Sequence, residues 1–207
     1  MSKHTNRAEH GFSLIELVTV VALILIVTGW AVINMAGATQ NAKANAAMDG
    51  VVNILRQARE LAIAKRRNVE VQFNMPNQVT LTVLTLPGEA APAPIAPVYL
   101  NDNAPGGSTF MLFPSLPDTP MNFGNGNAIN LQQPGGGGAW TVMFTTSGAF
   151  VGTSQSAGVL YQTTNNDPVN ASIFMGVQGN TNTARAVTIF GATGRVRSYH
   201  WNGSWQE

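Results

Sequence analysis

The sequence predicts an α+β fold in which one long N-terminal helix packs on an antiparallel β-sheet domain. Three features of the 207 residues lead to this prediction. Residues 17–42 form a charge-free, largely apolar stretch, residues 44–62 carry an apolar stripe at helical spacing, and the remaining chain contains short segments of alternating apolar and polar residues. A helix followed by many strands is typical of the α+β class, and no internal repeat or second globular domain is visible.

The charge-free stretch has the length of a membrane-spanning helix. Residues 17–27 are almost wholly apolar, and the extension to Met35 gives the roughly 20 residues that cross about 30 Å of hydrocarbon. Lys3 and Arg7 lie before this stretch, and a long chain follows it. Since basic flanking residues remain in the cytoplasm, we expect a single membrane pass with a cytoplasmic N-terminus and an exported C-terminal domain.

The residues in front of this stretch do not form an ordinary secretory signal. Such a signal has a shorter apolar core followed by a small-residue cleavage site, and this sequence has neither. Instead, Gly11 and Phe12 open the apolar segment, and Glu16 stands five residues after the glycine. With Lys3 and Arg7 in the leader, the arrangement closely resembles the type IV prepilin signal, which combines a basic leader, a glycine, a phenylalanine or methionine, and a glutamate at the fifth mature position.

The resemblance implies a role for each of these residues. A prepilin peptidase would cut between Gly11 and Phe12 on the cytoplasmic side and methylate the new amine of Phe12. Glu16 would pair with the Phe12 amine of a neighbouring subunit and set the axial register of a filament. A carboxylate at the centre of a membrane helix costs about 2.5–3.5 kcal/mol, which favours such a partner. Taken alone, Glu16 also fits a headgroup-level carboxylate in a plain signal anchor.

The helix is expected to continue beyond the membrane as an amphipathic segment. Charged residues such as Asp49, Arg56 and Glu60 lie away from its apolar stripe. The basic residues 65–67 end the segment, because cations suit a helix C-terminus. The stripe that would dock on a sheet consists of Ala44, Ala47, Met48, Val51, Leu55, Ala58 and Ala62.

The rest of the chain is expected to form strands joined by turns and loops. Residues 69–73 and 79–83 alternate apolar and polar side chains around the turn signal Pro76-Asn77, which predicts a hairpin. A last strand is expected at 195–201, after a glycine-containing turn at 191–194. Further strands are expected at 109–113, 140–145, 159–161, 172–177 and 186–190. Loops are expected at 87–97, which is rich in proline and alanine, and at 122–138, which is rich in glycine.

Residues 55–64, followed by 69–73, resemble the GspH/FimT group of minor pseudopilins and minor pilins. This resemblance implies a structural subunit of a type II secretion pseudopilus or a type IV pilus, near the filament tip and in the bacterial inner membrane, with its C-terminal domain in the periplasm. The implied partners are a prepilin peptidase, sister minor subunits, the major subunit and inner-membrane lipid. The expected segments are a leader at 1–11, a membrane half of the helix at 12–35, an amphipathic half at 36–67 and a β-rich exported domain at 68–207.

Composition argues against an enzyme. The chain has no cysteine, and of its three histidines only His200 follows the expected cut, so thiolate chemistry, disulfides and a histidine metal cluster are unavailable. The carboxylates of Asp102, Asp118 and Asp167 lie far apart without catalytic spacing. We therefore expect no catalytic residue, no metal site and no cofactor. The formal net charge of +1 gives no global attraction to nucleic acid, so only a local basic patch could act.

One such patch is expected on the last strand. Alternate residues of a strand share a face, which groups Arg195, Arg197, Tyr199 and Trp201. Together with Arg185 they would form a locally positive region, and cations beside aromatic rings can contact phosphates and stack on bases.

Residues 194–197 also resemble the Gly-Arg-x-Arg motif of FimT-type proteins that bind DNA in natural transformation. DNA binding through Arg195 and Arg197 is therefore a second hypothesis beside the purely structural one. The alternative for the two arginines is protection of an edge strand against aggregation. A third hypothesis for the whole chain is a signal-anchored periplasmic protein unrelated to filaments.

Overall fold

The computed structural model describes residues 12–85, 88–90, 93–100, 107–132, 141–152 and 168–207. The predicted cleavage residue Gly11 and the strand expected at 159–161 lie outside these ranges. The chain forms two compact units, Met1–Thr39 and Gln40–Glu207. Helix α1 (Leu14–Lys65) begins in the first unit and ends in the second.

The described part of the first unit consists mainly of the N-terminal portion of α1. Its segment Leu14–Ala31 has a mean hydropathy of 2.4, and none of its residues is buried against the rest of the described chain. Apolar side chains such as Leu23, Ile26 and Trp30 stay exposed along it. The predicted helix is therefore present here, and it is long and apolar enough to cross a membrane.

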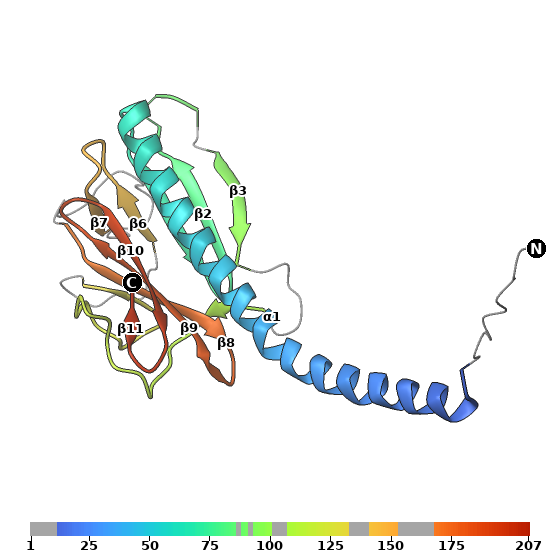
Figure 1. Cartoon of the computed structure of the whole chain (residues 1–207). Helices are drawn as coiled ribbons and strands as arrows, with labels where there is room; N and C mark the ends of the chain where they lie inside the picture. The colour runs from blue at the N-terminus through green and yellow to red at the C-terminus, as the bar shows by residue number, and fades with distance from the viewer. Residues whose placement is uncertain (1–11, 86–87, 91–92, 101–106, 133–140, 153–167) are drawn as a thin grey trace, which may run out of the picture. The chain divides into compact units, whose positions relative to one another are not determined.

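The second unit contains two antiparallel sheets, which Figure 1 shows beside the C-terminal portion of α1. The first sheet has the order β3 (Pro94–Tyr99), β2 (Gln78–Val83), β1 (Val69–Asn74), β6 (Thr141–Phe144) and β7 (Phe150–Gly152). The second has the order β11 (Trp205–Gln206), β10 (Arg195–Trp201), β9 (Asn180–Phe190), β8 (Ala171–Val177) and β4 (Thr109–Phe110), and β5 (Ile129–Leu131) also pairs with β8. The α+β class with one long helix on antiparallel strands is confirmed.

The apolar stripe of α1 packs against both sheets. Val51 and Leu55 are fully buried and share one apolar core with Phe144 of β6 and Ile189 of β9. Each buried leucine or valine stabilises the fold by about 1.5–3 kcal/mol. Six of the seven predicted stripe residues are buried, and Met48 packs against this core while partly buried, so the predicted stripe is confirmed.

The predicted hairpin at 69–83 is the β1–β2 pair. Val71 of β1 lies opposite Leu81 of β2, and both side chains are buried on the helix side of the sheet. The turn signal at Pro76-Asn77 joins the two strands as expected. The strand predicted at 195–201 is likewise present with those bounds as β10.

The two predicted loops are each wrong in part. Strand β3 occupies 94–99 within and beyond the region 87–97, and β5 occupies 129–131 within 122–138. Pro94 and Pro97 lowered the expectation of a strand, because proline cannot donate to a sheet ladder. Since β3 is the edge strand of its sheet, a missing N–H can face outward without breaking a pair.

Several strands also differ in length from the prediction. Only residues 109–110 of the segment 109–113 are strand, because the chain then leaves the sheet edge. Conversely, β9 begins at Asn180 rather than at 186, since its polar first half still pairs with β8. Strands β7 and β11, three and two residues long, were not predicted at all. The strands expected at 140–145 and 172–177 correspond to β6 and β8 within one residue at each end.

Candidate functional site

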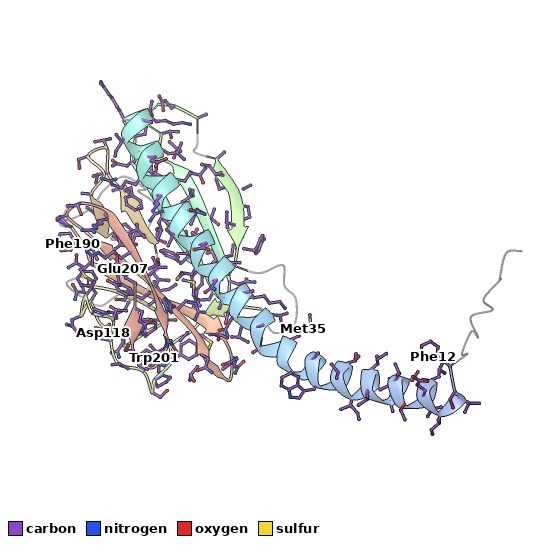
Figure 2. The ribbon with its side chains drawn as sticks, in the orientation of Figure 1. Phe12, Met35, Asp118, Phe190, Trp201 and Glu207 are labelled. Carbon is purple, nitrogen blue, oxygen red and sulfur yellow. The ribbon has the colours of Figure 1, made fainter. Side chains whose placement is uncertain are left out.

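The first candidate site is the beginning of α1. Phe12 precedes the helix and is 83% exposed, and Figure 2 labels it there. Glu16 lies in the first helical turn, where its backbone carbonyl accepts a hydrogen bond of 2.8 Å from the Thr19 hydroxyl. Its carboxylate has no hydrogen-bond or ion-pair partner within the described part of the chain. The described part of the chain therefore places no cation beside the Glu16 carboxylate.

The second candidate site is the outer face of the second sheet, the face turned away from α1. In the antiparallel register Arg195 lies opposite Phe190, and Arg197 lies opposite Thr188. Residues directly opposite in a ladder project to the same side, so these four side chains share the outer face. Val196, between the two arginines, instead packs against the core under α1. The predicted grouping of Arg195 with Arg197 is thus the one that the register gives.

The aromatic half of the predicted face packs against other aromatic side chains. Tyr199 is only 3% exposed and packs with Phe174 and Ala186. Trp205 of β11 lies 5.3 Å from Trp201, measured between ring centroids, and its indole N–H donates a hydrogen bond of 2.8 Å to the carbonyl of Pro117. Tyr199 is therefore closed to a ligand, whereas Trp201 and Trp205 keep part of their surface accessible, and Arg195 is the one exposed residue of β10.

The arginine half of this face contains a hollow of about 320 Å³ beside the two arginines. Phe190 contributes a ring that is 41% exposed and that contacts Phe123 at a centroid distance of 6.3 Å. Figure 2 labels Phe190 at the end of β9, Trp201 at the end of β10 and Glu207, which follows β11. The lining residues are Met121, Thr188, Phe190, Thr193, Arg195 and Arg197.

The two arginines at this hollow differ in their partners. Arg197 donates a hydrogen bond of 3.3 Å to the carboxylate of Glu207, and both side chains are partly exposed. The guanidinium of Arg195 is exposed and has no partner among the residues that the structure describes. The hollow therefore combines an apolar ring with one free cation and one weakly neutralised cation.

Arg185 does not belong to this positive region, so that part of the prediction is wrong. Its side chain is 5% exposed and lies on the α1 side of β9, where Nε donates a hydrogen bond of 2.7 Å to the Asn45 side chain. A second nitrogen donates to the carbonyls of Asn182 at 3.1 Å and Ala184 at 2.9 Å. Burial lowers the pKa of Arg185. Had the predicted strand begun at Asn180, the alternation of side chains along it would have placed Arg185 on the face toward α1.

The local backbone geometry requires a glycine at position 194. Gly194 has φ +63°, and a Cβ atom there would collide with the carbonyl oxygen of Gly148 in the β6–β7 turn. Arg59 of α1 donates a hydrogen bond of 3.3 Å to that same carbonyl. A turn from each sheet therefore meets the helix at Arg59, and the fold requires a glycine at 194 whatever the arginines do.

Acidic residues do not converge on a reactive site in the described part of the chain. No group of three or more histidine, cysteine or carboxylate side chains gathers there. Asp118 accepts hydrogen bonds from the backbone N–H groups of Thr119 at 2.6 Å and Gly124 at 2.7 Å, so it closes its own loop. Asp102 and Asp167 lie outside the described residues.

Sequence reasoning missed the apolar part of the hollow. Phe190 could have been found, because the predicted turn at 191–194 places the residues on its two sides opposite each other. Met121 and Glu207 reach the site through a long loop and a short final strand, for which the sequence carries no periodic signal.

Residues 6–32 match the family described as the prokaryotic N-terminal methylation motif, and Gly11, Phe12 and Glu16 lie within the match. Among solved structures, the chain is similar to the type IV minor pilin FimU of Pseudomonas aeruginosa, with 14% identity, a TM-score of 0.45, and coverage of 79% of this chain and 97% of that chain. It is also similar to the minor pseudopilin EpsH from the type 2 secretion system of Vibrio cholerae, with 12% identity, a TM-score of 0.42, and coverage of 76% and 97%. No curated protein sequence matches the chain.

Proposed function

We propose that this chain is a membrane-anchored, non-catalytic subunit of a type IV pilus or of a type II secretion pseudopilus. The observation that carries the proposal is that a match to the N-terminal methylation motif coincides with an apolar helical segment that has no buried residue. A helix that is apolar on all sides requires lipid or other apolar helices around it. A membrane supplies lipid before assembly, and neighbouring subunits supply helices within a filament.

Glu16 provides the assembly contact in this proposal. It is the one charged residue in the segment 12–42. Cleavage after Gly11 creates an amine on Phe12, and methylation of that amine preserves its positive charge. The methylated Phe12 amine of a neighbouring subunit then neutralises Glu16 in a medium of low dielectric constant, where the attraction is much stronger than in water. Because each pair joins successive subunits, it fixes their axial offset.

The same proposal assigns location and partners. The anchor lies in the bacterial inner membrane with its N-terminus in the cytoplasm, and the unit from Gln40 to Glu207 lies in the periplasm. Prepilin peptidase processes the chain, and the major subunit and sister minor subunits pack against α1. A position near the filament tip follows from the resemblance of residues 55–64 to minor subunits.

Mass spectrometry of the purified protein tests the processing step. We expect a mature chain that begins with N-methyl-phenylalanine at residue 12. Retention of residues 1–11 would instead support the signal-anchored protein unrelated to filaments.

Substitution tests the assembly contact. Glu16→Gln should insert into the membrane normally but fail to enter filaments, whereas Thr19→Val, which removes a neighbouring polar group, should assemble. Wild-type incorporation of Glu16→Gln would remove the proposed pairing.

We infer DNA binding as a second function, supported by the cluster of Arg195, Arg197 and an exposed aromatic ring at one hollow. Arginine side chains that neutralise phosphates release counterions, so affinity falls with salt. The double substitution of Arg195 and Arg197 by glutamine should weaken DNA binding and flatten this salt dependence. Arg56→Gln, at an exposed position on α1, is the matched control. Unchanged affinity in the double variant would exclude this surface.

A further inference from the structure

We propose that the hollow beside Arg195 and Arg197 receives one unpaired nucleobase, so that the protein prefers single-stranded DNA to duplex DNA. The base stacks on Phe190, and the phosphates on either side of it contact the two arginines. This inference rests on the DNA binding proposed above and names the form of DNA that the site takes.

The exposed ring of Phe190 supplies the stacking surface. Phe190 ends β9 and leaves 41% of its side chain exposed, although the neighbouring outer-face residues Thr188 and Ala186 are buried. Phe123 contacts its ring and thereby fixes the ring's orientation. Stacking of a base on an aromatic side chain contributes favourably with any base, because every base has a flat π-face.

The size of the hollow selects an unpaired base. A volume of about 320 Å³ is at the small end of ligand pockets, which suits a single flat ring system. In a duplex the faces of the bases are covered by stacking, and only their edges are accessible in the grooves. A duplex could therefore contact the arginines but not the face of Phe190.

Two cations lie where the backbone of an inserted nucleotide would pass. Arg195 and Arg197 are two residues apart on one strand, so their Cα atoms are separated by roughly 6.6 Å along β10. Both side chains line the hollow, together with the hydroxyl-bearing residues Thr188 and Thr193. A polyanion with a flat apolar group between its charges matches this pattern of cations around a ring.

Glu207 acts as an internal competitor for this site. Its carboxylate contacts Arg197 at 3.3 Å, and both groups are partly exposed. Exposed ion pairs of this kind are weak, so a phosphate can displace the carboxylate. Removal of this charge should therefore raise DNA affinity by roughly two- to fivefold.

Fluorescence anisotropy with the mature full-length protein in detergent tests the proposal. The probes are a labelled 20-mer of oligo(dT) and a labelled duplex of the same length, measured at one salt concentration. We expect tighter binding of the single strand. Phe190→Ala should reduce affinity for the single strand roughly five- to hundredfold and leave duplex affinity unchanged. Met75→Ala, at another exposed apolar side chain, is the matched control, and Glu207→Gln should bind more tightly.

A second probe protects the test against misfolding of the Phe190 variant. An abasic oligonucleotide keeps the phosphates but lacks the stacking base, so the wild-type protein should bind it as weakly as the variant binds oligo(dT). Equal affinity for abasic and intact strands, or for duplex and single strand, would overturn base insertion while leaving phosphate contact by the arginines. Absence of binding to every DNA probe would overturn the DNA-binding function itself. Competition by poly-glutamate as effective as by oligo(dT) would show an acidic peptide site instead and also overturn the proposal.

Discussion

The two portions of α1 belong to one continuous helix but have opposite surroundings. Along Leu14–Ala31 no residue is buried, whereas the portion from Gln40 to Lys65 buries a continuous stripe under two sheets. The two threonine hydroxyls of the first portion are satisfied within the helix, since Thr19 donates to the carbonyl of Glu16 at 2.8 Å and Thr28 donates to the carbonyl of Ile24 at 2.7 Å. The second portion finds its partners within the chain, and the first must find them in lipid or in other chains.

This difference separates two kinds of residue that look alike in sequence. Under the proposed function, a leucine in the first portion affects membrane insertion and assembly. A leucine in the second portion affects the folding of the β-rich unit. Substitutions placed in each portion should therefore give different phenotypes, which can be ranked by their expected effect on unfolding.

The largest effect is expected from Leu55→Ala. Leu55 has no exposed surface and lies in the shared core, so its truncation should lower the free energy of unfolding by about 2–5 kcal/mol. Leu23→Ala, in the exposed apolar portion, should leave this free energy unchanged. Denaturant titration of the full chain in detergent micelles, followed by tryptophan fluorescence, measures both. Equal effects of the two substitutions would contradict the division of the helix.

The next effect is expected from Arg185→Ala. The substitution removes the guanidinium that donates hydrogen bonds to the Asn45 side chain and to two backbone carbonyls. Because Arg185 itself is only 5% exposed, the loss should lower the free energy of unfolding by about 1.5–3 kcal/mol. Arg56→Ala, on the exposed face of α1, should change stability by less than about 0.5 kcal/mol. The same titration distinguishes them. A neutral Arg185→Ala would mean that these hydrogen bonds do not tie the helix to β9.

A smaller loss is expected from Gly194→Ala. Positive φ and the collision with the Gly148 carbonyl should together cost about 1–3 kcal/mol, and the displaced turn should loosen the contact with Arg59. Gly203→Ala keeps the cost of positive φ without a collision, because no atom lies within 4 Å of the added Cβ. Thermal unfolding should therefore show a lower midpoint for the first variant than for the second. The reverse order would exclude close packing of the two turns.

The smallest effect concerns pH. Glu70 of β1 lies between Thr82 and Met143 on the outer face of the first sheet, and burial raises the pKa of its carboxyl group. The native state then holds this proton more tightly than the unfolded state. Its contribution to stability is complete below the ordinary glutamate pKa of about 4.3 and is lost as pH rises through the raised native value.

Glu70→Gln should accordingly remove a decline in stability as pH rises above the ordinary glutamate pKa of about 4.3. Denaturant midpoints of both proteins over this range give the difference. An identical decline in the variant would show that other groups cause it.

The sequence was most informative where one physical rule determined the outcome alone. The spacing of Ala44, Val51 and Leu55 predicted the buried stripe, because an apolar face must be covered by something. Alternation in the segments 69–73 and 79–83 predicted a hairpin that sheet pairing then confirmed. The prepilin-type signal could be recognised because it consists of a few neighbouring residues, and these lie within the match to the N-terminal methylation motif.

The remaining elements depend on partners that are distant in sequence. Strand β5 has only three residues and exists because β8 offers it an edge, and the polar first half of β9 is a strand for the same reason. The burial of Tyr199 depends on Trp205 and on a loop around Leu112 and Met121. No rule of periodicity within the last strand could separate the buried Tyr199 from the exposed Arg195.

The order of strands has a consequence for how the molecule is made. Strand β1 pairs with β6, where Val69 lies opposite Phe144. Between these two strands the chain forms β4 and β5, which belong to the other sheet. During synthesis, β1 therefore keeps one open edge until the chain has been delivered as far as Thr141–Phe144. Such distant pairings slow the search for the native topology, and an unpaired edge is prone to association with other chains. The interleaved connectivity thus gives β1 a long interval in which its open edge can pair with another chain before β6 arrives.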